Sequence, residues 1–222
     1  MIDFYQIVYK DEQEKECYPF AKIYRNGTIT EYFENSIIGK LVPDCESRLI
    51  GVASWRLRRK RLDGWTPMLC GFAGKEDDLC EEKILKQDAD IMVLTPRSRT
   101  HQMLANAAHW HGGPQHAYAW EHAIDELRKF MKVPTEVNTP IYENHFIARK
   151  EVYHEYVANC LHPVMLYMSD KDVFLSDSGY DRKKERTQPA EVERYRNETG
   201  RNDWPIAPFI LERLFSIWIN DK

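Results

Sequence analysis

One phrase of the chain reads Arg48-Leu49-Ile50-Gly51-Val52-Ala53-Ser54-Trp55-Arg56-Leu57-Arg58-Arg59-Lys60-Arg61. Its apolar first half predicts a buried strand, which a tryptophan and a run of cations follow. Residues after a strand lie at the mouth of an open α/β sheet, where such folds bind ligands. Arginines there suit phosphate, because the guanidinium fork matches phosphate oxygens in a bidentate way. The alternative interpretation is a strand followed by a solvated basic turn.

The composition describes a chain that can bury a core. It has 222 residues, 43% of them hydrophobic and 12% aromatic, so disorder over most of its length is not expected. The formal net charge is −4, and nothing global therefore points to nucleic acid as a partner. The cysteines form no Cys-x-x-Cys pair, which is typical of reduced thiols in a cytosolic protein. They are Cys17, Cys45, Cys70, Cys80 and Cys160.

Hydropathy predicts a soluble, cytoplasmic protein. Residues 1–5 show no basic region followed by an apolar stretch, so we expect no signal peptide. No apolar stretch approaches the roughly 20 residues that span a bilayer, so we expect no transmembrane segment. Association with a membrane would then be peripheral, through a surface or a partner.

Apolar periodicity predicts strands and helices that alternate along the chain. The expected strands, rich in β-branched and aromatic residues, cover 4–9, 49–53, 91–94 and 143–148. The expected helices cover 76–87, 116–133, 149–168 with a bend at Pro163, and 207–220. A helix that feeds an apolar strand is the pattern of an α/β domain. We therefore expect a single α/β domain over residues 1–222, with a mixed sheet flanked by helices.

Two segments allow more than one structure. The turn residues Asn26-Gly27 favour pairing of Thr28 to Phe33 across the turn, and an irregular loop is the alternative. Residues 170–204 are dense in charge and turn formers. They predict a long loop that is mobile or folds over a ligand, with plain surface disorder as the alternative.

Asp88 and Asp90 form an Asp-x-Asp pair beside a predicted strand. Carboxylates two residues apart could share Mg²⁺ or Mn²⁺ that also holds a diphosphate. The pair precedes the strand at 91–94, however, and sites in α/β sheets gather at the carboxyl ends of strands. The alternative is two solvent-exposed residues in a helix-to-strand turn.

One short segment of the chain is rich in histidine. His109-x-His111 beside a Gly-Gly-Pro sequence could ligate zinc, as in a metal-dependent hydrolase, although no carboxylate or cysteine completes a familiar zinc spacing. A second interpretation is a substrate-binding or general-base histidine, with His111 and His116 as the candidates. The third is a polar loop that enters the long helix. The segment contains His101, His109, His111, His116 and His122.

Glu212 and Arg213 lie in the predicted last helix. Adjacent helical residues point about 100° apart, so the two side chains do not pair with each other. One interpretation places them at a surface edge. The other makes them a buried anchor that ties the helix to the sheet.

The strong linear motifs of common enzymes are absent from the sequence. It contains no Gly-x-Ser-x-Gly, no Walker lysine loop and no Gly-x-Gly-x-x-Gly. Their absence disfavours the common hydrolase, nucleoside-triphosphatase and dinucleotide-binding folds. It leaves sugar-nucleotide enzymes open, because these often lack a strong linear motif.

Three separated phrases resemble, in order, a bacterial family of unknown function linked to capsular and exopolysaccharide glycosyltransferases. LIGVASWRLR at 49–58 is similar to its IGL-x-HYRR pattern, and YENHFIARKEVY at 142–153 to its Y-x-x-N-M-F-I-M-x-K-E-x-F pattern. FILERLFSIW at 209–218 is similar to its F-L-A-E-R-L-L-N-V-W-L pattern. The resemblance implies a GT-A-like α/β domain that binds a nucleotide-sugar and transfers the sugar.

The same resemblance implies which residues bind the substrate. Arg56 and Arg58 match the two arginines of the family and would face the sugar-nucleotide. Asn144 matches its asparagine, and Glu212 with Arg213 matches its Glu-Arg pair.

The chain departs from the family pattern at three positions. The histidine and tyrosine of the family are Ser54 and Trp55 here, still within the substrate-binding phrase, and its methionine is His145. If the family histidine is catalytic, this chain uses different chemistry or none.

Two functions follow as hypotheses. In the first, a glycosyltransferase acts on a surface polysaccharide precursor, and arginines after the strand neutralise the leaving diphosphate, with or without a metal on the aspartate pair. His111, His116 and Glu143 are candidates for the base that activates the acceptor hydroxyl. In the second, the same fold is a non-catalytic module for sugar recognition or assembly.

Overall fold

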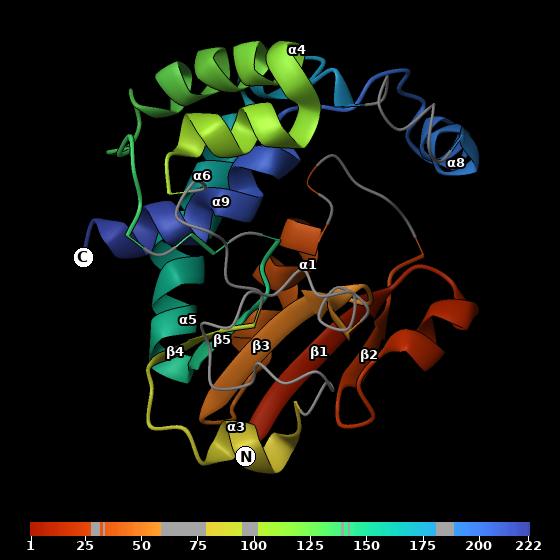
Figure 1. Cartoon of the computed structure of the whole chain (residues 1–222), viewed down its shortest axis with the longest axis vertical. Helices are drawn as coiled ribbons and strands as arrows, with labels where there is room; N and C mark the ends of the chain where they lie inside the picture. The colour runs from red at the N-terminus through yellow and green to blue at the C-terminus, as the bar shows by residue number, and fades with distance from the viewer. Residues whose placement is uncertain are drawn as a thin grey trace.

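The predicted strand after Arg48 is the central strand of a sheet in the computed structural model (Figure 1). The structure describes residues 1–27, 32, 34–58, 79–94, 102–138, 140–141, 143–180 and 189–222, except the side chains of 106–112 and 191. In this part of the chain the sheet has five strands, in the order β2-β1-β3-β5-β4. Their bounds are Ile2–Val8 (β1), Lys22–Arg25 (β2), Leu49–Ser54 (β3), Ile91–Val93 (β4) and Phe146–Arg149 (β5).

The sheet is mixed, because β5 runs antiparallel to both of its neighbours. β1 pairs in parallel with β2 on one side and with β3 on the other. The carboxyl ends of β1, β2, β3 and β4 therefore share one edge with the amino end of β5. The expected class, an α/β fold with a mixed sheet flanked by helices, is confirmed.

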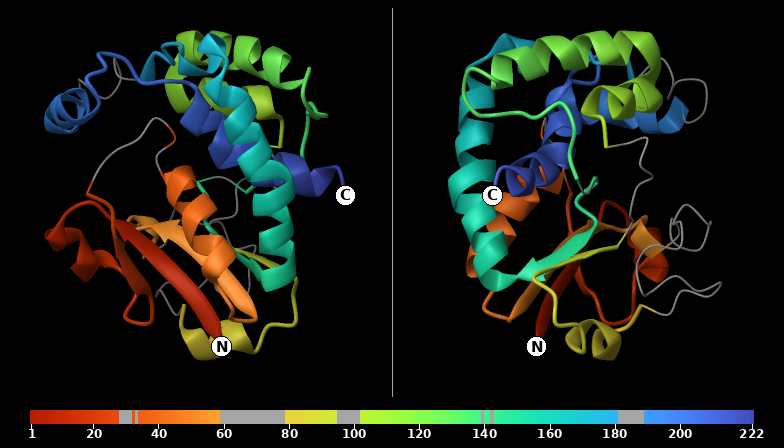
Figure 2. Two further views of the ribbon diagram at one scale, coloured as in Figure 1. Left: turned by 180° about the vertical axis from the view of Figure 1, so that it is seen from behind. Right: turned by 60° about the vertical axis from the view of Figure 1, so that its left-hand side comes forward.

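Helices cover the sheet and build a second layer beside it. Figure 2 shows α1 and the α5–α6 helix over one face of the sheet. The α-helices of the described ranges are Glu34–Leu41 (α1), Glu81–Leu85 (α3), Leu104–Leu127 (α4), Lys150–Tyr156 (α5), His162–Ser169 (α6), Pro189–Thr199 (α8) and Ala207–Asn220 (α9). Short 3-10 turns span Asp11–Glu16, Val42–Asp44 and Asp172–Leu175, and a π-helical turn spans Val157–Leu161.

Alternation along the strands produces two apolar faces. One face, which includes Ile50 and Val52, joins the large core built with α1, α5 and α9. The opposite face includes Phe4, Leu49 and Ile147 and packs against α3 and the turn after β1. Gly51 lies between its cross-strand partners Phe4 and Ile147 on this second face, where a Cβ would come within 2.6 Å of the Phe4 ring and 2.8 Å of Ile147.

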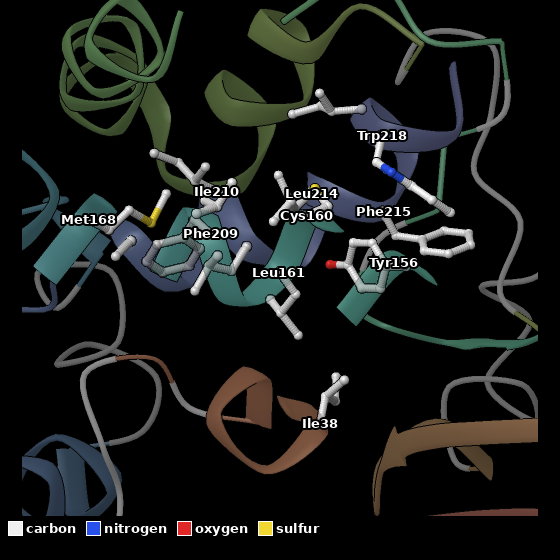
Figure 3. Packing of buried hydrophobic residues seen from close by; sticks show 14 of the residues in the cluster. Ile38, Tyr156, Cys160, Leu161, Met168, Phe209, Ile210, Leu214, Phe215 and Trp218 are labelled. Carbon is white, nitrogen blue, oxygen red and sulfur yellow. The ribbon is translucent and has the colours of Figure 1, made fainter. Parts of the chain in front are cut away.

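The last helix, α9, lies where the sequence predicts it and is the most buried helix of the core (Figure 3). Phe215 stacks on Phe146 of β5 with ring centroids 3.9 Å apart, and Tyr156 packs edge-on against the Phe215 ring at 5.0 Å. The helix thereby joins the sheet to the α5–α6 layer, and aromatic packing of this kind adds to the burial term.

Two predicted helices differ in detail from the observed ones. α4 begins earlier than expected, and it is interrupted at Gly113, whose φ of 79° is left-handed. Its second half therefore starts at Pro114, close to the predicted start. Where the sequence predicts a bend at Pro163, helical backbone continues from α5 to α6 through the π-helical turn, which ends just before His162 and Pro163.

The prediction of a long loop at 170–204 is wrong for its described part. A 3-10 turn and α8 occupy it, and α8 is held by Tyr195, whose ring stacks on Trp204 at 4.1 Å. The predicted pairing of 28–33 lies outside the described residues, apart from Tyr32. Within the described ranges, every helix is too short or too polar to cross a bilayer.

Candidate functional site

The candidate site lies at the edge of the sheet where the carboxyl ends of β1 and β3 meet. The chain runs from β1 to β2 on one side and then returns to place β3 on the other side. In open α/β sheets, ligands bind outside the carboxyl ends of strands at such a switch point. Ser54 ends β3 at this edge, and β5 begins there directly after His145.

Three polar side chains form a chain of contacts at this edge. The Oγ of Ser54 lies 3.3 Å from Nε2 of His145, and Nδ1 of His145 lies 3.5 Å from Oε2 of Glu143. The His145 side chain is 0% exposed, that of Glu143 is 22% exposed, and Ser54 is half-buried. The contact between His145 and Glu143 is an ion-pair contact rather than a hydrogen bond, and in the tautomer protonated at Nδ1 the His145 ring accepts at Nε2 from the Ser54 hydroxyl.

The backbone that presents these groups is strained. Glu143 and Asn144 have φ values of 61° and 57°, which are left-handed and uncommon for residues other than glycine. Asn144 donates from Nδ2 to Oδ1 of Asn35 at the start of α1, over 3.1 Å, and both side chains are buried. The Leu94 amide donates to the His145 carbonyl over 2.8 Å. Strained residues held by their surroundings in this way cluster at functional sites.

A half-buried tyrosine connects the end of β1 with α1 and the basic phrase. Burial and the nearby Glu34 carboxylate raise the pKa of Tyr9 well above its ordinary value, while Arg56 acts in the opposite direction. The guanidinium of Arg56 also lies over the Trp55 ring, 5.2 Å from its centroid. Arg58 is half-buried. A positive charge, a carboxylate and the Ser54–His145–Glu143 chain therefore come from neighbouring elements at one edge.

The aspartate pair lies at the opposite edge of the sheet. Oδ1 of Asp88 accepts from Nη2 of Arg149, and Oδ1 of Asp90 pairs with Nε of the same guanidinium, both over 2.9 Å. The aspartate side chains are 92% and 70% exposed. The positive charge that the two carboxylates share disfavours a divalent cation at this place, and Mg²⁺ or Mn²⁺ on the pair stays a prediction. Among the described residues, no group of three or more His, Cys, Asp or Glu side chains is arranged to hold a metal ion.

Of the two candidate histidines in the histidine-rich segment, the structure describes the side chain of His116 and not that of His111. His116 is fully buried in α4, its Nδ1 lies 3.0 Å from the Ser178 carbonyl, and its ring packs edge-on against Phe209 at 4.6 Å. These contacts tie α4 to α9 rather than to the sheet edge. His111 is a residue of α4 whose side chain, like that of His109, is outside the described residues.

Arg213 behaves as an anchor of the helical layer. It is 2% exposed, its guanidinium lies over the Trp120 ring of α4 at 5.0 Å, and its Nη1 donates to the Phe209 carbonyl. The interpretation of a buried anchor is therefore favoured, although the partner is α4 and not the sheet. Glu212 is half-buried beside it.

The sequence reasoning missed the role of His145. It treated this residue only as a departure from a family pattern, yet the antiparallel register that pairs Gly51 with Ile147 brings residue 54 beside 144 and 145. The available signal was a serine at the end of one strand and a Glu-x-His at the start of another. Comparisons of the chain with protein-family models, with curated proteins and with solved structures find no match.

Proposed function

We propose that this protein is a glycosyltransferase that moves a sugar from a nucleotide-sugar donor to a hydroxyl of a surface polysaccharide precursor. The observation that carries the proposal is the Ser54–His145–Glu143 chain beside Arg56 at the carboxyl edge of β3. Transfer to a hydroxyl needs a base for the acceptor proton and positive charge for the leaving diphosphate. This edge offers both.

Arg56 and Arg58 bind the leaving diphosphate and neutralise its charge. Both follow β3 directly and are half-buried, so their charge is partly removed from water while their side chains stay accessible. The Trp55 ring fixes one side of the Arg56 guanidinium. Fixed donors aimed at a developing negative charge are usually a large catalytic term.

The base is the imidazole of His145, and it acts through Ser54. Because His145 is fully buried, an acceptor sugar meets the half-buried Ser54 hydroxyl first. As the acceptor oxygen attacks the anomeric carbon of the sugar, the bond from that carbon to the diphosphate breaks and the nucleoside diphosphate leaves. The acceptor proton passes to Ser54 Oγ while the Ser54 proton passes to Nε2 of His145. Glu143 holds the imidazole in the required tautomer and balances the charge that it gains.

The arrangement supports an enzyme over a non-catalytic module. The main reason for expecting a non-catalytic module is that the chain has Ser54 where the resemblance expects a histidine. Here the imidazole of His145, the residue before β5, lies 3.3 Å from the Ser54 hydroxyl. The chain thus keeps an imidazole at this edge, supplied by His145.

A ligand screen tests the donor half of the proposal. We would measure the thermal midpoint with UDP-, GDP-, CMP- and dTDP-sugars, because a ligand that binds only the native state stabilises it by about 2.7 kcal/mol at 100 times its dissociation constant. We expect one nucleotide class to raise the midpoint, and Arg56→Ala to abolish the rise. Arg128→Ala is the matched control, since that arginine pairs with Asp125 at the end of α4. A rise that survives Arg56→Ala contradicts the proposed phosphate site.

A further inference from the structure

We infer that Ser54 is a nucleophilic serine, activated by His145, that attacks carboxylic esters. This reactivity is separate from sugar transfer and does not depend on a nucleotide-sugar site. It follows from the order of the three groups, from their burial and from the place of Ser54 in the fold.

The order of the groups is hydroxyl, imidazole and carboxylate. An adjacent base that a third group orients is the general signature of an activated nucleophile. The 3.3 Å separation from Ser54 to His145 is a long hydrogen bond, and the 3.5 Å separation from His145 to Glu143 is an ion-pair contact. Catalytic hydrogen bonds are often long without substrate and shorten when it binds.

The difference in burial favours Oγ of Ser54 as the reacting atom among Ser54, His145 and Glu143. The His145 side chain is 0% exposed, whereas Ser54 is half-buried, so of these two side chains the serine is the one open to solvent. Ser54 is half-buried and is the last residue of β3, and a turn leads from it into helical residues at 57–58. A hydroxyl at a strand-to-helix turn on the carboxyl edge of a sheet has the position of a hydrolase nucleophile.

One feature of hydrolases is absent at this turn. The amide that follows a serine nucleophile usually stabilises the oxyanion, but the Trp55 amide donates to the Ile7 carbonyl over 3.0 Å, within the sheet. Loss of one such donor costs about 10²–10³-fold in turnover. We therefore expect slow ester cleavage, and covalent labelling of Ser54 is the better measurement.

The reaction balances without a cofactor. Oγ of Ser54 attacks the ester carbonyl carbon while its proton moves to Nε2 of His145. The tetrahedral intermediate expels the alcohol, which takes that proton, and an acyl-serine remains. Water, deprotonated by His145, then attacks the acyl group and releases the carboxylic acid, which restores the serine.

The test is labelling of the full chain with a fluorophosphonate, a phosphorus electrophile that reacts with activated serines, followed by peptide mass spectrometry. We expect a single adduct on Ser54, none at that site in Ser54→Ala, and a rate at least 10²-fold lower in His145→Asn. We expect p-nitrophenyl acetate cleavage to fall in parallel. Ser176→Ala is the control, since this exposed serine only donates to the Val173 carbonyl and its loss should leave labelling unchanged.

Several results would overturn the inference. These are a folded wild-type protein without an adduct on Ser54, equal labelling in folded His145→Asn, or labelling of Ser176 as fast as of Ser54. Because His145 is buried, Ser54→Cys provides a second test that keeps the imidazole. Its thiol should react with iodoacetamide faster than that of the half-buried Cys80 in the same molecule, and equal rates would reject activation by His145.

Discussion

The two edges of the sheet carry similar side chains in different settings. At the carboxyl edge, the side chains of Glu143 and His145 are mostly or fully removed from water, and the backbone is left-handed at Glu143 and Asn144. At the amino edge, Asp88 and Asp90 stand in solvent and share the guanidinium of Arg149. Burying polar groups and holding strained backbone both cost free energy, whereas exposed ion pairs cost little. Of these two groups of side chains, the one at the carboxyl edge carries those costs and the aspartate pair does not, which favours the carboxyl edge as the functional one.

The largest expected effect comes from His145→Asn. The variant keeps a polar side chain but removes the base, and we expect release of nucleoside diphosphate from the donor found in the ligand screen to slow by about 10²–10⁴-fold. The thermal shift with that donor should remain, because the arginines are untouched. A variant that binds the donor and transfers sugar at the wild-type rate would contradict the assignment of the carboxyl edge as the functional one.

Glu143→Gln should have a smaller effect, because Glu143 is a positioning residue that acts through His145. We expect about a 10²-fold lower kcat with an unchanged KM for the donor, since the amide cannot balance the charge that the imidazole gains. The thermal midpoint separates this role from a structural one. Glu143→Asp, which keeps the carboxylate, should recover part of kcat, and no recovery would contradict a role for the charge.

Asn144→Ala tests the strained backbone by its effect on stability. The change removes the hydrogen bond to Asn35, leaving a buried acceptor without its donor, and places alanine at a φ of 57°. Together these cost about 2–4 kcal/mol of unfolding free energy, measured by urea denaturation. Asn144→Gly is the matched control. Glycine accepts this φ freely, so it should lose about 1 kcal/mol less, and equal losses would show that the backbone there is unstrained.

The sequence could predict the elements whose apolar period is long and regular. The strand before Ser54, the first strand and the helix at 207–220 lie within a residue or two of their predicted bounds. α8 escaped prediction because charge dominates its sequence, and among its described side chains Val192 and Tyr195 are the buried ones.

The site was predicted in part, since several of its residues were named but their contacts were not. The register between β3 and β5 decides that Ser54 meets His145, and it arises from packing between segments about 90 residues apart. The left-handed pair at 143–144 is likewise invisible to periodicity, because glutamate rarely adopts such a φ. Strand-end position favoured the carboxyl edge over the aspartate pair, and the structure shows that the two aspartates are exposed and share Arg149, while the choice of edge stays a prediction.

The smallest effect should come from the amino edge, where Asp88→Asn with Asp90→Asn removes both carboxylates from Arg149. We expect at most about 1 kcal/mol of unfolding free energy to be lost, and less in about 0.5–1 M salt, because exposed ion pairs are weak and salt screens them. Donor turnover, measured with and without Mg²⁺, should match the wild-type protein in both conditions. Loss of a Mg²⁺-dependent part of the activity in this variant would instead assign the metal to the exposed pair, and the two edges would then share the chemistry.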